Sequence, residues 1–334
     1  MMKRAVCLIV LLSALTSCKA TGKTQLETVR VSTRKHFSTA PIFIADEAGF
    51  FADEGIRIEF AEAPGRSAQA IPLLERGQID VLAATVGAAL FAAAEKGARL
   101  RMVADRGHIS SSGCVFNAFV GSSKAFKSDS VTAADLRGKS VSINAGVTAA
   151  WITDLFLESR GLTVDDVRVV ALTDVLEPGA MSSGSLDVTH AAEPFLSQLV
   201  RDGQRVIGLA STYAPGAHFG AIMFGPTLTV TNRALGERFM RAYLRGVRQY
   251  EEGPTPRNVA MLTKRMGFDE SLLRTACFAS INTDGRLDVI SLNAFQRWAV
   301  KRGYLPRVMP TESIIDTTFA HDAAASLDSA ASRR

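Results

Sequence analysis

The chain has 334 residues, of which 47% are hydrophobic, so it is long enough for two domains with cores of their own. This composition excludes a disordered or fibrous protein. The formal net charge of +5 includes Lys3 and Arg4, which lie in a segment that we expect to be removed. The remaining excess is weak and comes without a basic run or aromatic-interleaved basic patch, so it gives no support for nucleic-acid binding.

The N-terminus is typical of an exported protein. Two basic residues precede an apolar run from Ala5 to Leu15, which is shorter than the roughly 20 residues of a transmembrane helix. The run ends in Leu-Thr-Ser-Cys, which resembles a bacterial lipobox, where cleavage precedes a cysteine that becomes lipidated. We therefore expect a signal peptide over residues 1–17, a lipid anchor on Cys18 and a polar tether over residues 18–27. The alternative is an ordinary signal peptide with an incidental cysteine.

After Cys18 the chain contains only two more cysteines, Cys114 and Cys277. Neither lies in a CxxC pair or near a histidine at metal-ligand spacing. In an oxidising compartment they form either one disulfide or two unrelated buried thiols. We expect no metal, no cofactor and no cysteine nucleophile.

The first elements predict a parallel βαβ unit. Val29 to Val31 and Ile56 to Phe60 alternate between apolar and polar residues like half-buried strands. Between them, Pro41 to Ala48 follows two hydroxyl residues, which is the pattern of a helix start. Gly49 and Gly55 fit left-handed positions that end two helical turns.

Two segments about a hundred residues apart repeat one pattern. Each has a glycine at a helix end, then an apolar-Asp-Val strand and a new helix start. The strands are Ile79-Asp80-Val81 and Leu186-Asp187-Val188. The repetition predicts two similar α/β lobes.

Residues 100–103 and 115–120 also read as strands, and they can carry the chain from the first lobe to the second. The second lobe then continues with a helix, a strand, a helix and a strand over 133–136, 140–143, 149–160 and 167–172. A return crossing is expected at 221–230, with a strand-like alternation at 228–230. Helices that return to the first lobe are expected over 235–250, 271–279 and 291–301.

These elements place the first lobe at residues 28–112 plus 227–322 and the second lobe at 113–226. The tail from Ala323 to Arg334 is rich in Ala, Ser and Asp, so we expect it to be disordered.

Residues 45–56, ADEAGFFADEGI, resemble the A-x-x-x-G-F-F-x-x-E-G-I signature of the periplasmic substrate-binding proteins for sulfonates, taurine, nitrate and thiamine-pyrimidine precursors. Further blocks follow in the same order, namely ERGQID at 75–80, ADLRGKSV at 134–141, SGSLD at 183–187 and EPF at 193–195. The resemblance covers roughly residues 29–199 well and the C-terminal helices loosely. It implies a type II periplasmic-binding-protein fold, in which two Rossmann-like lobes joined by two hinge strands close over a ligand.

Three features depart from this pattern. The segment from Arg106 to Gly113, with three consecutive serines, is more polar than expected for the first crossing. Pro72 falls inside an expected helix, where it removes a hydrogen bond or delays the helix start. Pro178-Gly179 likewise interrupts the helix before the second repeat.

In open parallel α/β sheets the ligand cleft lies beyond the carboxyl ends of the strands, where helix N-termini present unpaired N–H groups. We expect ligand contacts from strand-to-helix loops of both lobes, with helix capping or surface exposure as the alternative for each residue. The candidates on the first lobe are His36, Ser38, Thr39, Arg66, Ser67 and Thr85. The candidates on the second lobe are Asn144, Gly146, Thr148, Glu193, Tyr213 and His218.

The ligand class stays open at this point. Helix ends and Arg66 favour a sulfonate or another anion, whereas Glu193 and the nearby aromatic residues favour an amine or a heterocycle such as a pyrimidine. The expected function is that of a monomeric, lipid-anchored receptor, outside the cytoplasm, that delivers a small solute to an ABC permease and its ATPase, without catalysis. The alternatives are an enzyme on the same fold, as in thiamine-pyrimidine or menaquinone biosynthesis, and a sensory ligand-binding protein.

Overall fold

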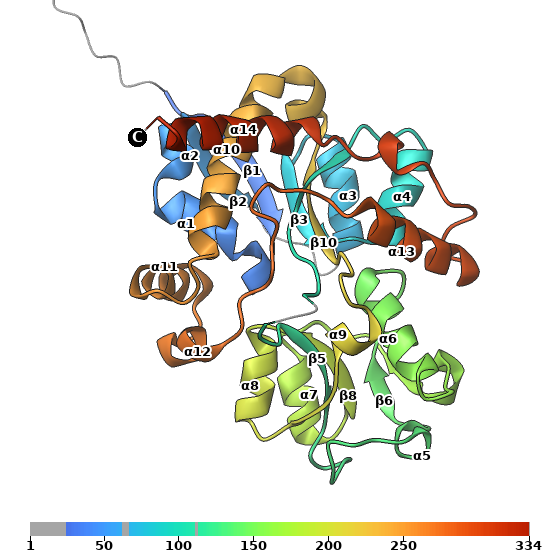
Figure 1. Ribbon diagram of the computed structural model, residues 1–334. Coiled ribbons are helices and arrows are strands. Elements are labelled where there is room, and N and C mark those ends of the chain that lie inside the picture. Colours follow the sequence, from blue (N-terminus) through green and yellow to red (C-terminus); the bar gives the residue numbers. More distant parts are fainter. Residues whose placement is uncertain (1–24, 62–66, 111–112, 334) are drawn as a thin grey trace, which may run out of the picture.

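The computed structural model describes residues 25–61, 67–110 and 113–333 (Figure 1). The predicted signal peptide, Cys18 and Arg66 lie outside these residues, as does the side chain of Ser67. No helix in the described ranges combines the length and the apolar character needed to cross a bilayer.

The chain forms two α/β lobes, each built on a five-stranded sheet with the same topology (Figure 1). In each sheet three neighbouring strands are parallel, and the fourth runs antiparallel to both of its neighbours. The first sheet consists, in spatial order, of β2 (Ile56–Ala61), β1 (Glu27–Thr33), β3 (Val81–Thr85), β10 (Gly220–Phe224) and β4 (Arg101–Asp105). The second consists of β7 (Arg168–Val170), β6 (Ser140–Ser142), β8 (Val188–Ala192), β5 (Asn117–Gly121) and β9 (Arg205–Leu209). This arrangement confirms the predicted two-lobed α/β fold.

Helices surround both sheets. Those of the first lobe are α1 (Ala40–Glu47), α2 (Phe50–Asp53), α3 (Ser67–Glu75), α4 (Ala88–Glu95), α10 (Arg233–Tyr250), α11 (Pro256–Met266), α12 (Glu270–Thr275), α13 (Val289–Lys301) and α14 (Thr318–Ala331). Those of the second lobe are α5 (Ala133–Leu136), α6 (Thr148–Glu158), α7 (Glu177–Ser183), α8 (Phe195–Arg201) and α9 (Ala210–Tyr213). Short 3-10 turns lie at Phe37–Thr39, Val164–Asp166 and Thr311–Ser313.

The two prolines that depart from the family pattern are both accommodated. Pro72 lies inside α3, which therefore has one N–H donor fewer than its length allows. Pro178 lies in the first turn of α7, where a missing N–H costs no intrahelical bond.

The repeated aspartates explain why the same sequence pattern occurs in both lobes. Asp80 immediately precedes β3, and its Oδ2 accepts a hydrogen bond of 2.9 Å from the backbone N–H of Arg30 in β1. Asp187 immediately precedes β8, and its Oδ2 accepts one of 2.8 Å from the backbone N–H of Ser140 in β6. Each carboxylate therefore ties the start of its strand to the neighbouring parallel strand.

The return from the second lobe differs from the prediction. Gly220–Phe224 forms β10, which pairs with β3 and β4 and so belongs to the first sheet, although the sequence placed residues up to 226 in the second lobe. Thr227–Thr231 is a π-helix and not a resumed strand. The strand ends before Pro226 because proline has no N–H to donate to a sheet.

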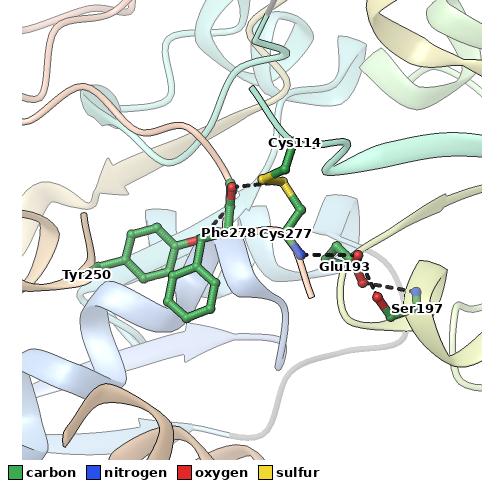
Figure 2. The surroundings of a disulfide bond; sticks show 7 residues. Cys114, Glu193, Ser197, Tyr250, Cys277 and Phe278 are labelled. Carbon is green, nitrogen blue, oxygen red and sulfur yellow. Dashed lines mark hydrogen bonds between the residues drawn. A yellow bond between two sulfur atoms is a disulfide. The ribbon is translucent and has the colours of Figure 1, made fainter. Parts of the chain in front are cut away.

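The predicted helix over 271–279 is shorter than expected, since α12 ends at Thr275. The following residues run beside the junction of the lobes, where the backbone N–H of Ala279 donates to the hydroxyl of Tyr250 at 2.6 Å. Cys277 in this segment forms a disulfide with Cys114, with an S–S distance of 2.06 Å (Figure 2). The structure thus decides between the two alternatives that the sequence left open for these cysteines.

The prediction of a disordered C-terminal tail is wrong for the residues that the structure describes. Residues up to Ala331 form α14, which lies across α10 (Figure 1). Phe319, Ala320, Ala323 and Ala324 recur on one face of this helix and are buried. Alanine has the highest intrinsic helix propensity, so a tail that looks low in complexity is also a good helix former.

Replacing Asp187 by alanine should lower the free energy of unfolding by about 1–3 kcal/mol, because the substitution leaves the backbone N–H and the hydroxyl of Ser140, at the start of β6, without their acceptor. Urea unfolding followed by circular dichroism measures the change. The exposed Asp202, at the end of α8, provides the matched control, and its alanine variant should stay close to the wild type. Equal stability of both variants would contradict the tying role of Asp187.

Candidate functional site

A cavity of about 280 Å³ lies between the two lobes. Its walls include the carboxyl ends of β1 and β3 from the first lobe and of β8 from the second, together with the loops that follow β6 and β7. This is the location that the topology of parallel α/β sheets predicts for a ligand cleft.

The structure brings five of the predicted candidates together in this cavity, and a sixth lines a neighbouring one. His36, Ser38, Thr85, Asn144 and Thr148 line the interlobe cavity. Gly146 lines a second cavity that adjoins the first. Their role as ligand contacts stays a prediction.

Four other candidates lie elsewhere. Thr39 donates its hydroxyl to the backbone oxygens of Arg34 and His36, at 2.6 and 2.8 Å, and so stabilises the loop before α1. Tyr213 receives a hydrogen bond of 3.1 Å from Arg160 within the second lobe.

The carboxylate of Glu193 lies at the start of α8, next to the disulfide, and not at the interlobe cavity. It accepts hydrogen bonds from the backbone N–H and the hydroxyl of Ser197, at 3.0 and 2.8 Å, and from the backbone N–H of Cys277 at 3.3 Å (Figure 2). The capping interpretation of Glu193 therefore accounts for these contacts without a ligand.

Two crossing segments connect the lobes, one between β4 and β5 and the other between α9 and β10, and His218 is buried where they meet. Its Nε2 lies 3.6 Å from Oδ1 of the fully buried Asp105, and residue 218 pairs with His108 of the other crossing segment. Burial lowers the pKa of His218, although the Asp105 charge opposes this shift. His218 therefore joins the crossing segments to each other.

Arg106 is one of the polar cavity residues that the sequence analysis missed, together with Arg34, Asn117, Asp174 and His190. It directly follows β4 and is only 4% exposed. Its Nη1 donates to Ser38 Oγ at 2.9 Å and its Nη2 lies 3.5 Å from Thr85 Oγ1. Its Nε has no hydrogen-bond partner among the described residues.

Arg106 stays charged although no carboxylate of the described residues forms an ion pair with it, because the charges of Asp105 and Asp174 offset part of the cost of burial. Burial lowers the pKa of the guanidinium to about 10, which still leaves it protonated at neutral pH. Among the described residues no acidic side chain forms an ion pair with it, whereas the neighbouring Arg34 has Asp174 as a partner at 3.3 Å. A buried cation of this kind is costly unless an anion neutralises it.

Gly220 in β10 creates the space for this guanidinium. A Cβ atom at this position would lie 2.5 Å from both Nε and Nη2 of Arg106. A larger residue at position 220 would therefore displace the guanidinium from this place, although the backbone conformation would accept it.

Asp174 connects the two lobes at the edge of the same cavity. It follows β7 and lies 3.3 Å from Arg34 Nη1 and 3.0 Å from His36 Nε2, both on the first lobe. Burial disfavours the ionised carboxylate, but the hydrogen bond from His36 and the charges of His36 and Arg34 outweigh it and lower the pKa of Asp174 to about 2.

Backbone contacts also join the lobes around the cavity. The N–H of Ala88 donates to Gly146 O at 2.7 Å, and the N–H of Thr148 donates to Val86 O at 3.1 Å. The hydroxyl of Thr148 donates to Phe219 O at 3.1 Å. The lobes are thus closed over the cavity, and Thr148 contributes to the closure.

The second-lobe wall is largely uncharged. His190 in β8 stacks on Phe119 with ring centroids 4.8 Å apart, and burial lowers its pKa to about 4, so it is neutral at physiological pH. Asp174 is balanced by its two partners on the first lobe. The guanidinium of Arg106 is therefore the charged group of the cavity that has no ion-pair partner among the described residues. The described residues contain no group of three or more His, Cys, Asp or Glu side chains placed to hold a metal ion.

The chain was compared with known proteins. A sequence profile described as NMT1/THI5 like matches residues 36–255, about two thirds of the chain. The chain belongs to the NMT1/THI5-like family. A search of curated proteins found no match.

Solved structures share the fold of this NMT1/THI5-like protein at low sequence identity. The periplasmic aliphatic sulphonate-binding protein SsuA from Escherichia coli superimposes with a TM-score of 0.67 at 18% identity, over 87% of this chain and 92% of that chain. SsuA from Xanthomonas axonopodis pv. citri, an alkanesulfonate-binding protein bound to MOPS, gives 0.69 at 19%, over 88% and 99%. The periplasmic nitrate-binding protein NrtA from Synechocystis PCC 6803 gives 0.73 at 13%, over 91% and 90%. These similarities confirm the predicted periplasmic-binding-protein fold.

Glu177 at the start of α7 provides a test of the electrostatics beside the cavity. Burial raises the pKa of its carboxyl group to about 7, although a hydrogen bond of 2.7 Å from the Ser142 hydroxyl favours the ionised form. The folded protein therefore binds a proton more tightly than the unfolded chain. Between pH 4.5 and 7, the contribution of Glu177 to the stability of the protein should fall as the pH rises, by ~3 kcal/mol at 1.4 kcal/mol per pKa unit, whereas the lowered pKa of His190 gives a contribution of opposite sign.

The Glu177→Gln variant should lack this loss, so its stability relative to the wild type should increase across that pH window and stay constant above it. Urea unfolding of both proteins at pH 4.5 and pH 8 measures the difference. Glu312→Gln, at an exposed position, is the control, and its stability relative to the wild type should not change with pH. A Glu177→Gln difference that does not change with pH would show that Glu177 is not protonated on folding.

Proposed function

We propose that the protein is an extracytoplasmic receptor that captures a small anionic solute between its two lobes and delivers it to an ABC importer. The observation that carries this proposal is the buried guanidinium of Arg106, which lines the interlobe cavity without a carboxylate partner among the described residues. A bound anion would neutralise this charge. The hydroxyls of Ser38 and Thr85, which lie at the guanidinium, can donate hydrogen bonds to the same anion.

Lobe closure supplies a means of signalling that the site is occupied. The cavity is lined by residues of both lobes, so a ligand that contacts both stabilises the closed arrangement only. A permease that binds the closed arrangement would then distinguish loaded from empty receptor. The two serine–carboxylate pairs described above, Ser142–Glu177 and Ser197–Glu193, do not line the interlobe cavity, so they give no support to the enzyme alternative.

The location outside the cytoplasm rests on the N-terminal sequence and on the fold. We propose cleavage before Cys18, lipidation of this cysteine and attachment to a membrane surface. The receptor would act as a monomer. The names of the structural relatives, which bind sulfonates and nitrate, support an anionic solute as the ligand class.

Replacing Arg106 by glutamine should weaken anion binding by roughly 10- to 100-fold, since a hydrogen bond to a charged group contributes about 1.5–3 kcal/mol. Isothermal titration calorimetry of the wild type against methanesulfonate, nitrate, acetate, taurine and a neutral pyrimidine identifies the anion to use. The exposed Arg201 on α8 serves as the control for a lost positive charge. The proposal fails if Arg106→Gln binds the selected anion as tightly as the wild type, or if only the neutral compound binds.

The Gly220→Ala variant should weaken binding of the same anion, because the added methyl group displaces the guanidinium of Arg106. Its backbone conformation is open to alanine, so circular dichroism should show an unchanged fold. Gly179→Ala is the matched control, since a Cβ there meets no atom within 4 Å. Unchanged anion affinity in Gly220→Ala would place the anion away from Arg106.

A further inference from the structure

A second cavity, of about 290 Å³, adjoins the one that contains Arg106. The two cavities share six lining residues, so they form adjacent chambers of one cleft. The shared residues are Ala68, Leu82, Ala84, Thr85, Ala145 and Val147. Thr85 thus lies at the border and also near Arg106 Nη2, which places the cationic group close to the entrance of the second chamber.

The second chamber differs from the first in chemistry. Its remaining walls consist of aliphatic side chains such as Ile71, Leu90 and Met223, together with alanines and glycines. Apart from Thr85, only Tyr304 contributes a polar group, and no charged side chain among the described residues lines it. A polar solute would find almost no hydrogen-bond partners there.

Both lobes are needed to complete this chamber. α3 and α4 of the first lobe form its walls, and Gly146 and Val147 of the second lobe cover it. The cover is held by the hydrogen bond from Ala88 N–H to Gly146 O. Gly87 faces Val147 so closely that a Cβ would lie 3.1 Å from its Cγ1. A group inside the chamber is therefore enclosed only when the lobes are closed.

We propose that the solute is an amphiphilic monoanion, with its charged head at Arg106 and a hydrocarbon tail in the second chamber. This inference rests on the proposed function and narrows it. One unpaired cation matches one negative charge. An inorganic oxyanion occupies the space of only a few waters, at ~30 Å³ each, and would leave the apolar chamber without a complementary group. A hydrocarbon tail gains free energy in such a space because its surface leaves water.

The test is a pair of homologous series, the linear 1-alkanesulfonates and the linear alkanoates, from two to twelve carbons, titrated into the wild-type protein by calorimetry. Within each series the dissociation constant should fall about fourfold for each added methylene, the equivalent of ~0.8 kcal/mol. The gain should stop at the chain length that fills the chamber. Comparison of the two series at equal chain length shows whether the site prefers a sulfonate or a carboxylate head group. An affinity that does not rise with chain length in either series overturns the proposal.

A filling variant tests the place of the tail. Ala92 in α4 lines the chamber and is only half-buried, so Ala92→Leu should shorten the chain length at which the gain stops and weaken binding of the long chains at least tenfold. Methanesulfonate and acetate, which have no tail, should bind as they bind the wild type. Ala325→Leu on the exposed side of α14 controls for the added side chain. If long chains bind Ala92→Leu as tightly as the wild type, the tail does not occupy this chamber.

The outcomes separate this inference from the proposed function. If Arg106→Gln binds short anions more weakly, but the affinity of the wild type does not depend on chain length, the proposed anion receptor stands and the inference of an amphiphilic solute is wrong. If the wild type and Arg106→Gln bind short anions equally well, both the proposed function and this inference are wrong.

Discussion

The arrangement of the cleft depends on one positive charge, that of Arg106, which is buried without an ion-pair partner among the described residues. Arg106 lies directly after β4, at the point where the chain leaves the first lobe, and β10 returns beside it. Gly220 provides the space for the guanidinium, and Ser38 and Thr85 provide oxygen atoms but no negative charge. Burial alone would favour a neutral side chain, and a bound anion, as we propose, would offset the cost of keeping the charge there.

The duplicated architecture positions this charge. Each lobe has the same strand order, and the carboxyl ends of its parallel strands face the other lobe. Two sets of contacts hold the lobes closed around the cavity. Asp174 of the second lobe contacts Arg34 and His36 of the first, and backbone hydrogen bonds are donated by Ala88 and Thr148. The Cys114–Cys277 disulfide adds a covalent link between the first crossing segment and the chain after α12. Closure and ligand binding are thus properties of the same set of contacts.

Much of the fold follows from local sequence patterns. The repeated apolar-Asp-Val strands predict two like lobes, and the carboxylates of Asp80 and Asp187 show the physical reason for the repeat. Local patterns failed where long-range pairing decides the structure. The partners of β10 come from residues more than a hundred positions earlier, and the burial of Ala323 depends on α10. Neither partnership can be read from the segment itself.

The candidate site was predictable in location and only partly in composition. Strand-to-helix loops were the right place to search, and His36, Ser38, Thr85, Asn144 and Thr148 do line the cavity. Arg106 was missed because it lies in a crossing segment, which reads as a polar linker. The available signal was an arginine directly at the carboxyl end of a buried strand, next to a glycine. Glu193 was misleading because a carboxylate at a helix start has the same appearance with and without a ligand.

The most direct measurement of the central claim is anomalous X-ray diffraction from crystals of the protein soaked in sodium bromide. The account predicts a bromide ion inside the interlobe cavity, within hydrogen-bonding distance of the Arg106 guanidinium and of the hydroxyls of Ser38 and Thr85. A guanidinium paired with a carboxylate of the same chain, and bromide bound only on the outer surface, would contradict it.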